Sequence, residues 1–427
     1  MLNWESSFDD SLKTPNMAIY EYFNVAGEKY CFSADSLEIV QLSPGSNCDD
    51  VVWRDMEDSS IQTDRSSFSS DIIGINLVSG CNLACEYCYL SAYRKEIKKL
   101  DLAQLESILR FISERSQHPK TIYFIGGGEP TLNFEILRLV PALCDKYGIK
   151  GVRFSLTTNG TLLNEEMLQF FKSNSFDLNI SLDGDRYETD SFRKYKNGRG
   201  VFLDVFKNIE MLKSYDIPFT CKALLQPKND ILKTFMFFET QQIEFAIDFA
   251  NESFDGYYRT EPQDIELLKQ KLAKVAEYYA RKSGGGKIYC ASIRAGLSRI
   301  HKRLKNITAC RSVYNGYNID LDGKIYTCSM GAGNEKLMIG DILNGIDYQG
   351  AIKRKCYPES VELKDSCTKC WAKYLCSGGC FALNLIKTGY PDSPDLYRCE
   401  VEKAYWTFII NLYILLHPLV NKNRMKQ

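Results

Sequence analysis

Three cysteines with the spacing Cys81-x3-Cys85-x2-Cys88 form the strongest chemical motif in this chain. With 16 cysteines in 427 residues, such spacing is expected by chance only about 0.02 times. Iron–sulfur clusters are held by Cys thiolates, usually four per cluster, so three thiolates leave one iron open to another ligand. The alternative, a zinc knuckle, needs four tetrahedral ligands, and neither a histidine nor a fourth cysteine lies near this segment. The motif therefore predicts an iron–sulfur site with chemistry or electron transfer at its open iron.

A second group of cysteines lies in the C-terminal third of the chain. Four of them have the spacing C-x2-C-x5-C-x3-C, which chance composition does not explain. Together with their flanking partners they are Cys310, Cys328, Cys367, Cys370, Cys376, Cys380 and Cys399. A zinc ribbon is the alternative for a C-x2-C pair. The odd number of cysteines favours iron–sulfur chemistry instead.

The elements that must position the first motif are strands that alternate with helices. From Asp71 onward, apolar stretches alternate with amphipathic segments, which predicts a parallel sheet covered by helices. The predicted strands are 72–78, 121–125, 152–158, 177–183, 218–225 and 243–249. Ligands of parallel barrels bind at the carboxyl ends of the strands. The cysteine loop directly follows the first predicted strand, so it lies at that end.

Polar residues recur where later strands end. The glycine-rich segment Gly126–Pro130 follows the second strand, and glycines let the backbone approach a ligand closely. The third strand ends at Thr157 and Asn159, and the fourth at Ser181 and Asp183. Turn formation is the alternative, because Asn-Gly and Asp-Gly are ordinary turn formers. Their recurrence at the same end of successive strands favours a ligand site.

Arg193 follows the fourth strand, and its guanidinium is suited to bind a carboxylate through two hydrogen bonds. The alternative is a solvated surface arginine, because Arg186, Lys194, Lys196 and Arg199 lie nearby.

The cysteine motif and the Gly-Gly-Glu-Pro segment together resemble the radical S-adenosylmethionine (SAM) superfamily. The resemblance implies a partial (β/α)6 barrel and a 4Fe-4S cluster held by Cys81, Cys85 and Cys88, whose open iron binds SAM. One electron from the reduced cluster then yields a 5'-deoxyadenosyl radical, which removes a hydrogen atom from a substrate. In this resemblance Tyr87 lies against the adenine. The residues implied to position SAM are Tyr87, Gly127, Gly128, Glu129, Thr157, Asn159, Ser181, Asp183 and Arg193.

The C-terminal cysteines are similar to the SPASM domain of radical SAM maturases, which binds two auxiliary 4Fe-4S clusters. The implied outer ligands are Cys367, Cys370, Cys376 and Cys399, and the implied inner ligands are Cys310, Cys328 and Cys380. Members with a closed inner cluster have a further cysteine six positions before the first, where this chain has Leu304. Cys290 or Cys356 would supply the missing ligand, or one iron is open to substrate.

The chain divides into three predicted regions: a β-rich extension with a linker (1–70), the barrel (71–285) and the cysteine-rich SPASM domain with a C-terminal helix (286–427). Residues 17–43 alternate apolar and polar side chains, which predicts two or three antiparallel strands. This pattern is similar to the opening of a winged-helix-like module that binds a leader peptide in peptide-modifying relatives. Cys31 and Cys48 fall in this region and are treated as incidental.

Composition excludes several other classes of function. Lys and Arg total 53 against 54 Asp and Glu, which predicts neither nucleic acid nor an anionic membrane as a partner. The acidic N-terminus is unlike a signal peptide, and the longest apolar run, 406–420, is shorter than a membrane span and predicts a buried helix. We expect a cytoplasmic protein whose cysteines serve metal sites rather than disulfides.

These features predict a radical SAM/SPASM enzyme that acts on a ribosomally synthesised precursor peptide. The peptide would be cross-linked through a thioether or carbon–carbon bond, with a flavodoxin or ferredoxin-type electron donor; no catalytic base is assigned. One alternative is an anaerobic sulfatase maturase, which forms formylglycine. That family has an acidic base directly after the second SPASM cysteine, where this chain has Ser329. An alternative of another class is a non-catalytic iron–sulfur or zinc binding protein.

Overall fold

The computed structural model describes residues 19–53, 71–88, 96–115, 119–250, 261–282, 286–310, 312–355 and 357–417. Most of its strands belong to a ten-stranded sheet with the order β13-β12-β11-β10-β4-β5-β6-β7-β8-β9. A smaller sheet has the order β1-β2-β3.

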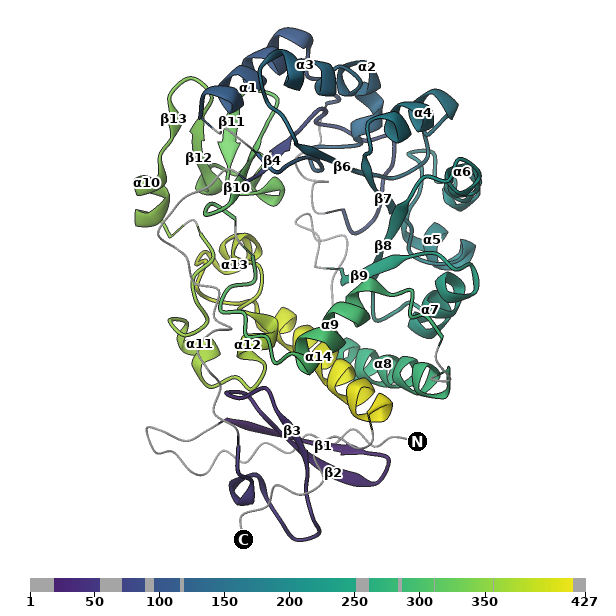
Figure 1. Cartoon of the computed structure of the whole chain (residues 1–427), viewed down its shortest axis with the longest axis vertical. Coiled ribbons are helices and arrows are strands. Elements are labelled where there is room, and N and C mark those ends of the chain that lie inside the picture. The colour runs from purple at the N-terminus through teal and green to yellow at the C-terminus, as the bar shows by residue number, and fades with distance from the viewer. Residues whose placement is uncertain are drawn as a thin grey trace.

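Six strands of the large sheet pair in parallel and in chain order, which confirms the predicted parallel sheet. They are Ile72–Ile75 (β4), Thr121–Phe124 (β5), Arg153–Thr158 (β6), Asp177–Ser181 (β7), Phe219–Leu225 (β8) and Phe245–Phe249 (β9). Figure 1 shows these strands curving into an open arc with helices along its outer side. The chain therefore has the partial (β/α)6 barrel that the resemblance implied.

Amphipathic helices cover the outer face of this arc. They are Leu102–Arg115 (α1), Phe134–Leu137 (α2), Val140–Lys146 (α3), Glu165–Ser173 (α4), Arg186–Phe192 (α5), Phe202–Ser214 (α6) and Ile231–Thr240 (α7). On α1, for example, one stripe is buried, with Leu105, Ile108, Leu109 and Ile112 at helical spacing. Asn164 begins α4, because its side chain accepts the backbone N–H of Met167.

The C-terminal region extends the barrel sheet. Gly316–Ile319 (β10) pairs in parallel with β4, and Lys324–Tyr326 (β11), Met338–Asp341 (β12) and Gly345–Ile346 (β13) follow in antiparallel order. Gly316 permits this pairing, because a Cβ there would lie 2.0 Å from the carbonyl oxygen of Ile72. The predicted third region thus shares a sheet with the second.

Seven further helices complete the fold. They are Pro262–Lys282 (α8), Ala291–His301 (α9), Tyr348–Lys353 (α10), Asp365–Thr368 (α11), Lys373–Cys376 (α12), Phe381–Thr388 (α13) and Leu396–Leu416 (α14). Helix α14 packs against α8 and α9 and buries much of the predicted apolar run. Among the helices of the described ranges, none is long and apolar enough to cross a membrane.

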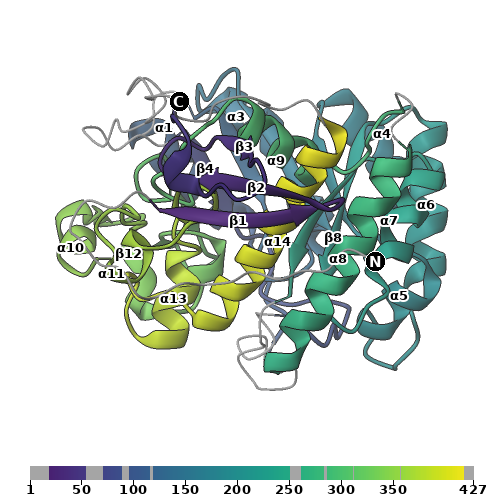
Figure 2. The ribbon, with the colours of Figure 1, turned by 90° about the horizontal axis from the view of Figure 1, so that it is seen from below.

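The small sheet consists of Tyr20–Val25 (β1), Glu28–Ser33 (β2) and Ile39–Gln41 (β3), all antiparallel. Figure 2 shows β1 lying across α14. The sheet packs on the segment between Cys370 and Cys376, where the ring of Trp371 meets Phe23 and Phe32 edge-on. Lys373 of the same segment pairs with Asp35 at 3.2 Å. The N-terminal sheet therefore covers part of the outer cysteine region.

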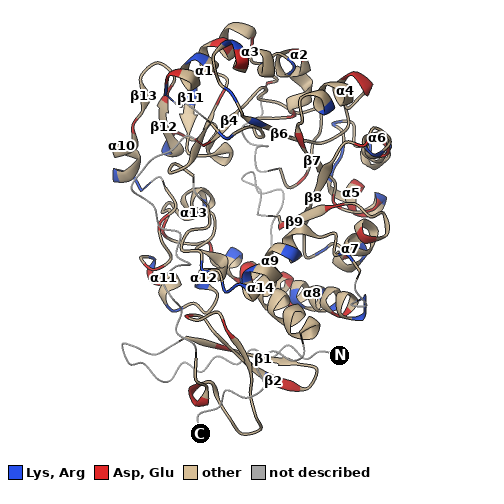
Figure 3. Ribbon diagram, viewed as in Figure 1, with Lys and Arg blue, Asp and Glu red and all other residues tan. Residues whose placement is uncertain are grey.

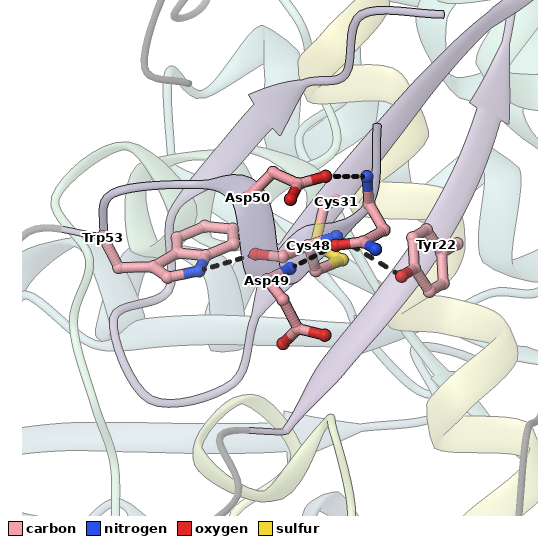
Figure 4. The surroundings of a disulfide bond; sticks show 7 residues. Tyr22, Cys31, Cys48, Asp49, Asp50 and Trp53 are labelled. Atoms are coloured by element: carbon pink, nitrogen blue, oxygen red, sulfur yellow. Dashed lines mark hydrogen bonds between the residues drawn. A yellow bond between two sulfur atoms is a disulfide. The ribbon is translucent and has the colours of Figure 1, made fainter. Parts of the chain in front are cut away.

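A disulfide joins Cys31 and Cys48, and it corrects the expectation that both are incidental. Cys31 lies on β2 and Cys48 begins a short 3-10 turn, with their Cα atoms 5.8 Å apart and both side chains buried. In Figure 4 the backbone N–H of Cys48 donates to the hydroxyl of Tyr22 (3.4 Å), and Trp53 Nε1 donates to the carbonyl of Cys48 (3.3 Å). These contacts hold the second thiol beside the first, which the spacing of 17 residues alone does not reveal.

Charged residues of both signs are interspersed along the helices (Figure 3). This distribution agrees with the formal net charge of −1.

Candidate active site

A cavity of about 510 Å³ lies at the carboxyl ends of the barrel strands. The cysteine loop after β4, the glycine-rich loop after β5 and the ends of β6 to β9 form its wall. Of the residues predicted to form a site, it is lined by Cys81, Cys85, Tyr87, Cys88, Gly128, Glu129, Thr157, Asn159, Ser181 and Arg193. Gly127 and Asp183 lie behind this lining. Sequence segments more than 100 residues apart thus meet around one space.

The segment after α5 holds the cysteine loop in place. The backbone N–H of Ala84 donates to the carbonyl of Lys194 (2.8 Å), and that of Glu86 donates to Phe192 (3.0 Å). Burial raises the pKa of the Cys85 thiol to about 12, although the nearby Arg193 lowers it. A bound metal displaces such thiol protons, because thiolates are the ligands.

The glycine-rich loop packs directly on the cysteine loop. A Cβ on Gly128 would lie 1.8 Å from the carbonyl oxygen of Gly80, and a Cβ on Gly127 would lie 2.3 Å from that of Val78. These glycines therefore let two backbones approach each other, in addition to any approach to a ligand.

Glu129 joins the glycine-rich loop to the end of β6. Its buried carboxylate accepts hydrogen bonds from the backbone N–H of Asn159 (2.7 Å), the hydroxyl of Thr158 (2.6 Å) and both the N–H and hydroxyl of Thr131 (3.1 and 2.6 Å). Burial raises the pKa of Glu129, and these donors oppose that rise. Because both oxygens accept hydrogen bonds from protein donors, Glu129 positions the loop around the cavity.

Asp183 forms a second buried junction. Arg193 binds its carboxylate through Nε and Nη2, at 2.8 and 2.9 Å. The backbone N–H of Leu224 (2.9 Å) and the hydroxyl of Tyr87 also donate to this carboxylate. The Arg193 guanidinium in turn lies 5.3 Å from the centre of the Tyr87 ring. Asp183 thus ties the cysteine loop, β8 and the segment after α5 together.

Asn159 reaches the cysteine loop from the end of β6. Its side-chain amide donates to Oδ1 of Asn82 (2.8 Å) and contacts Sγ of Cys81 (3.7 Å). Thr157 and Ser181 line the cavity from β6 and β7. The predicted positions at the strand ends are therefore brought together in space, as parallel strands require.

The four predicted outer cysteines meet in a second cavity of about 350 Å³. Cys367, Cys370 and Cys376 come from the α11–α12 region and Cys399 from the first turn of α14. Burial, together with the neighbouring thiolates of Cys367 and Cys370, raises the pKa of Cys399 to about 12.

The three predicted inner cysteines also lie together. Burial raises the pKa of Cys328 to about 12, with added effects from Cys380 and Cys310. Cys380 lies at the start of α13, where its sulfur accepts the backbone N–H of Leu383 (3.5 Å). Within the described ranges, no three His, Cys, Asp or Glu side chains converge closely enough to hold one metal ion.

The proposed sources of a fourth inner ligand differ in their surroundings. Leu304 is 41% exposed at the position where a further cysteine was considered. Cys290 is fully buried at the start of α9, where it bridges Phe245 of β9. Burial raises the pKa of Tyr279 and Tyr405, and the nearby Cys290 adds to that rise, so these side chains lie around Cys290. Cys356 lies outside the described residues.

Sequence reasoning missed two charged residues in the cavity wall, Lys222 of β8 and Asp248 of β9. Asp248 binds Arg398 of α14 at 2.8 Å, and Arg398 also contacts Glu402 (2.8 Å), so the barrel is linked to the outer cysteine region. Strand periodicity could have identified both residues, since alternate residues of a barrel strand point into the barrel.

Known proteins resemble this chain in sequence. The model of the radical SAM superfamily matches residues 75–234. A cysteine-type anaerobic sulfatase-maturating enzyme from Clostridium novyi (strain NT) is 31% identical over 210 residues, which cover 45% of this chain and 56% of that enzyme. The match thus spans little more than half of that relative.

Solved structures extend the likeness in fold. Native anSMEcpe with bound AdoMet has a TM-score of 0.67 at 22% identity, covering 82% of this chain and 100% of that one. Streptococcus suis SuiB bound to precursor peptide SuiA has a TM-score of 0.52 at 16% identity, covering 77% and 76%. These solved structures share the fold of this chain, and the family match over residues 75–234 identifies that part of it as a radical SAM domain.

Proposed function

We propose that this protein is a radical SAM/SPASM enzyme that modifies a ribosomally synthesised precursor peptide. The observation that carries this proposal is the single cavity into which the cysteine loop and the polar ends of β6 and β7 converge. Its volume of about 510 Å³ lies in the range of cofactor and ligand pockets.

The donor set fits the cofactors that the superfamily implies. Cys81, Cys85 and Cys88 would hold a 4Fe-4S cluster with one open iron, because all three thiols reach the cavity. SAM held there would supply, once the cluster is reduced, the 5'-deoxyadenosyl radical that the chemistry requires for hydrogen abstraction. The chain's own contribution is to orient SAM and enclose it.

Six of the predicted SAM residues either contact SAM or hold the cavity wall in this proposal. Thr157, Asn159 and Ser181 line the cavity and offer hydrogen bonds to the ribose and the amino-acid part of SAM. Glu129 and Asp183, whose carboxylate oxygens accept hydrogen bonds from protein donors, hold the loops that shape the cavity. Tyr87 presents its ring to the adenine, and Asp183 fixes the position of that ring.

The two C-terminal cysteine sets would hold auxiliary clusters. The outer set supplies four thiols, enough for a closed 4Fe-4S cluster. The inner set supplies three within the described residues, so its fourth ligand comes from the substrate or from the region of Cys356. A flavodoxin or ferredoxin-type protein would deliver the electron that reduces the SAM cluster.

A peptide cross-link is the product we infer. Its support is the likeness in fold to SuiB, which was solved with a precursor peptide, and the presence of Ser329 where formylglycine formation calls for an acidic base. Ser329 lies beside the glycine-rich loop, because a Cβ on Gly126 would meet the Ser329 side chain at 3.0 Å. A hydroxyl there is a much weaker base than a carboxylate.

Formylglycine formation is the second candidate, because the Clostridium novyi relative is a sulfatase-maturating enzyme. Product analysis separates the two reactions. A cross-link removes two hydrogen atoms from the peptide and keeps its sulfur, whereas formylglycine carries an aldehyde that hydrazides label.

The test gives the reconstituted, reduced protein and SAM two kinds of peptide. One is encoded by a short reading frame beside the gene, and the other is a cysteine peptide of the type bound to anSMEcpe. We expect the first to lose two hydrogens by mass spectrometry, and a thioether link would also remove its free thiol. If the second peptide gains an aldehyde and the first is unchanged, the cross-linking proposal is contradicted and formylglycine formation is supported.

A further inference from the structure

A buried lysine, Lys364, lies within the C-terminal cysteine region. Its side chain is only 2% exposed, which is rare for lysine, because an ammonium group is costly to remove from water unless a partner compensates its charge. Among the described residues, its ammonium donates to one acceptor, the carbonyl oxygen of Gly378 (3.2 Å), and forms no ion pair. The hydrogen bond from Lys355 (2.8 Å) lowers the pKa of the nearby Asp392, and Lys364 adds only a smaller effect. The charge of Lys364 is therefore not neutralised by a carboxylate.

The carbonyl that Lys364 binds belongs to the loop that joins the two cysteine sets. Gly378 is the middle residue of the three between Cys376, a predicted outer ligand, and Cys380, a predicted inner ligand. Residues 377–379 all have left-handed backbone conformations, with φ values of 64°, 80° and 68°. A Cβ on Gly378 would lie 2.9 Å from Nζ of Lys364, so the glycine leaves room for the ammonium. Lys364 thus holds a tightly turned loop with one ligand of each set at its two ends.

Thiols of both sets lie close enough to Lys364 to respond to its charge. Cys310 of the inner set is exposed as a residue, but the surrounding protein desolvates its thiol and raises the pKa to about 11, and Lys364 opposes this rise. Burial raises the pKa of Cys367 in the outer set, and Lys364 opposes that rise as well. The backbone N–H of Cys367 also donates to the carbonyl oxygen of Lys364 (2.8 Å). One buried cation therefore lies beside both sets.

We propose that Lys364 is a cation shared by the two auxiliary sites, where it holds the loop from Cys376 to Cys380 and raises the reduction potentials of both clusters together. This inference rests on the proposed function, which places a 4Fe-4S cluster at each cysteine set. Reduction adds one electron, and so one negative charge, to a cluster, and a nearby buried cation stabilises the reduced form. Lys364 is thus a positioning residue that acts through the clusters.

The experiment is a redox titration of the full, iron-reconstituted chain with alanine at Cys81, Cys85 and Cys88, so that only auxiliary clusters titrate. Dithionite supplies the electrons, and electron paramagnetic resonance measures the reduced form of each cluster. Further alanine substitutions at Cys367 and Cys370 remove the outer cluster, which assigns the remaining signal to the inner one.

Three variants separate the charge of Lys364 from its hydrogen bond. Lys364→Met removes both, Lys364→Gln keeps a donor for Gly378 without the charge, and Lys364→Arg keeps the charge. Lys353→Met, at an exposed position of α10, is the control for the loss of one positive charge. Iron content is measured for each variant before the titration.

We expect Lys364→Met and Lys364→Gln to lower the equilibrium constant for one-electron reduction of both clusters by about tenfold, which corresponds to about 59 mV. Lys364→Arg should keep both potentials, and Lys353→Met should change neither, because water and salt screen an exposed charge. Unchanged potentials in Lys364→Met with complete iron, or a shift of one cluster alone, would overturn the proposal. A shift in Lys364→Met that is absent from Lys364→Gln would assign the effect to the hydrogen bond and overturn the role of the charge.

Loss of auxiliary iron is a separate outcome. If Lys364→Met and Lys364→Gln lose this iron while Lys364→Arg retains both the iron and the potentials, the requirement for a cation is supported. Loss of auxiliary iron from all three variants would make Lys364 a structural residue and overturn the proposal. If the chain with Lys364 intact binds no auxiliary iron, the auxiliary clusters of the proposed function fail, and not merely this assignment.

Discussion

The guanidinium of Arg193 grips the carboxylate of Asp183 with two hydrogen bonds of 2.8 and 2.9 Å, and both side chains are buried. The same carboxylate accepts from Tyr87 in the cysteine loop and from the backbone of β8. Arg193, which was predicted to bind a ligand, thus binds Asp183 and stabilises the wall of the ligand site.

Asp183→Asn should be strongly destabilising. The amide removes the negative charge and presents donors to Arg193, so a buried guanidinium loses its partner. We expect a loss of about 3–5 kcal/mol, measured by urea unfolding of the full chain. Asp177→Asn, at the exposed start of β7, the strand that precedes Asp183, is the matched control. Equal unfolding midpoints for the two variants would contradict this assignment.

Glu21 makes the N-terminal sheet sensitive to pH. Burial raises the pKa of its carboxyl from 4.5 to about 7, although Lys403 and Lys269 lower it. Because the folded state holds this proton more tightly than the unfolded state, the stabilising contribution is complete below about pH 4.5 and is lost as the pH rises to about 7. The total change is at most about 3 kcal/mol.

Amide hydrogen exchange of β1 measures this effect. After correction for the pH dependence of the intrinsic exchange rate, we expect the exchange rate of β1 to increase with pH. Glu21→Gln should abolish the corrected slope, and Glu28→Gln, at an exposed position of β2, should preserve it. An unchanged slope in Glu21→Gln would assign the pH dependence to another group.

The Cys31–Cys48 disulfide should stabilise the N-terminal sheet. Closing a loop of this length lowers the entropy of the unfolded chain and so stabilises the folded sheet by about 3 kcal/mol. A Cys31→Ser/Cys48→Ser protein should therefore lose exchange protection in β2. Treatment of the wild-type protein with a phosphine reductant should reproduce this loss, and it should leave the double variant unchanged. Equal protection before and after reduction would show that packing alone holds the sheet.

Iron content tests the three cysteine sets separately. Four irons per cluster predict about twelve in the reconstituted wild-type chain. Alanine at Cys81, Cys85 and Cys88 should remove about four, as should alanine at Cys367 and Cys370. Cys144→Ala, in the buried face of α3, is the control and should remove none. A wild-type chain with far fewer irons would contradict the proposal of two auxiliary clusters.

The barrel could be predicted because its strands are short apolar runs separated by amphipathic helices, and because polar residues follow them. That pattern placed Cys81, Asn159 and Ser181 at the same end of the sheet. It could not show which polar groups form their hydrogen bonds with other groups of the protein. The hydrogen bonds from Thr158 and Asn159 to Glu129 join residues about thirty positions apart, and only the folded chain brings them together.

Other features escaped prediction for related reasons. Lys222 interrupts an apolar strand, and its place in the cavity wall depends on which face of β8 points inward. The pairing of β10 with β4 joins Gly316 to Ile72 across most of the chain. The disulfide was missed because the composition argument assigned every cysteine to metal binding or to the core, whereas Cys31 and Cys48 lie apart from all the cysteine sets.

The most direct test of the central claim is the formation of 5'-deoxyadenosine. Iron-reconstituted protein is reduced with dithionite, incubated with SAM and analysed by liquid chromatography, beside a variant with alanine at Cys81, Cys85 and Cys88. The account predicts 5'-deoxyadenosine from the wild-type protein and none from the variant. Intact, reduced clusters in the wild-type protein without any 5'-deoxyadenosine would contradict it.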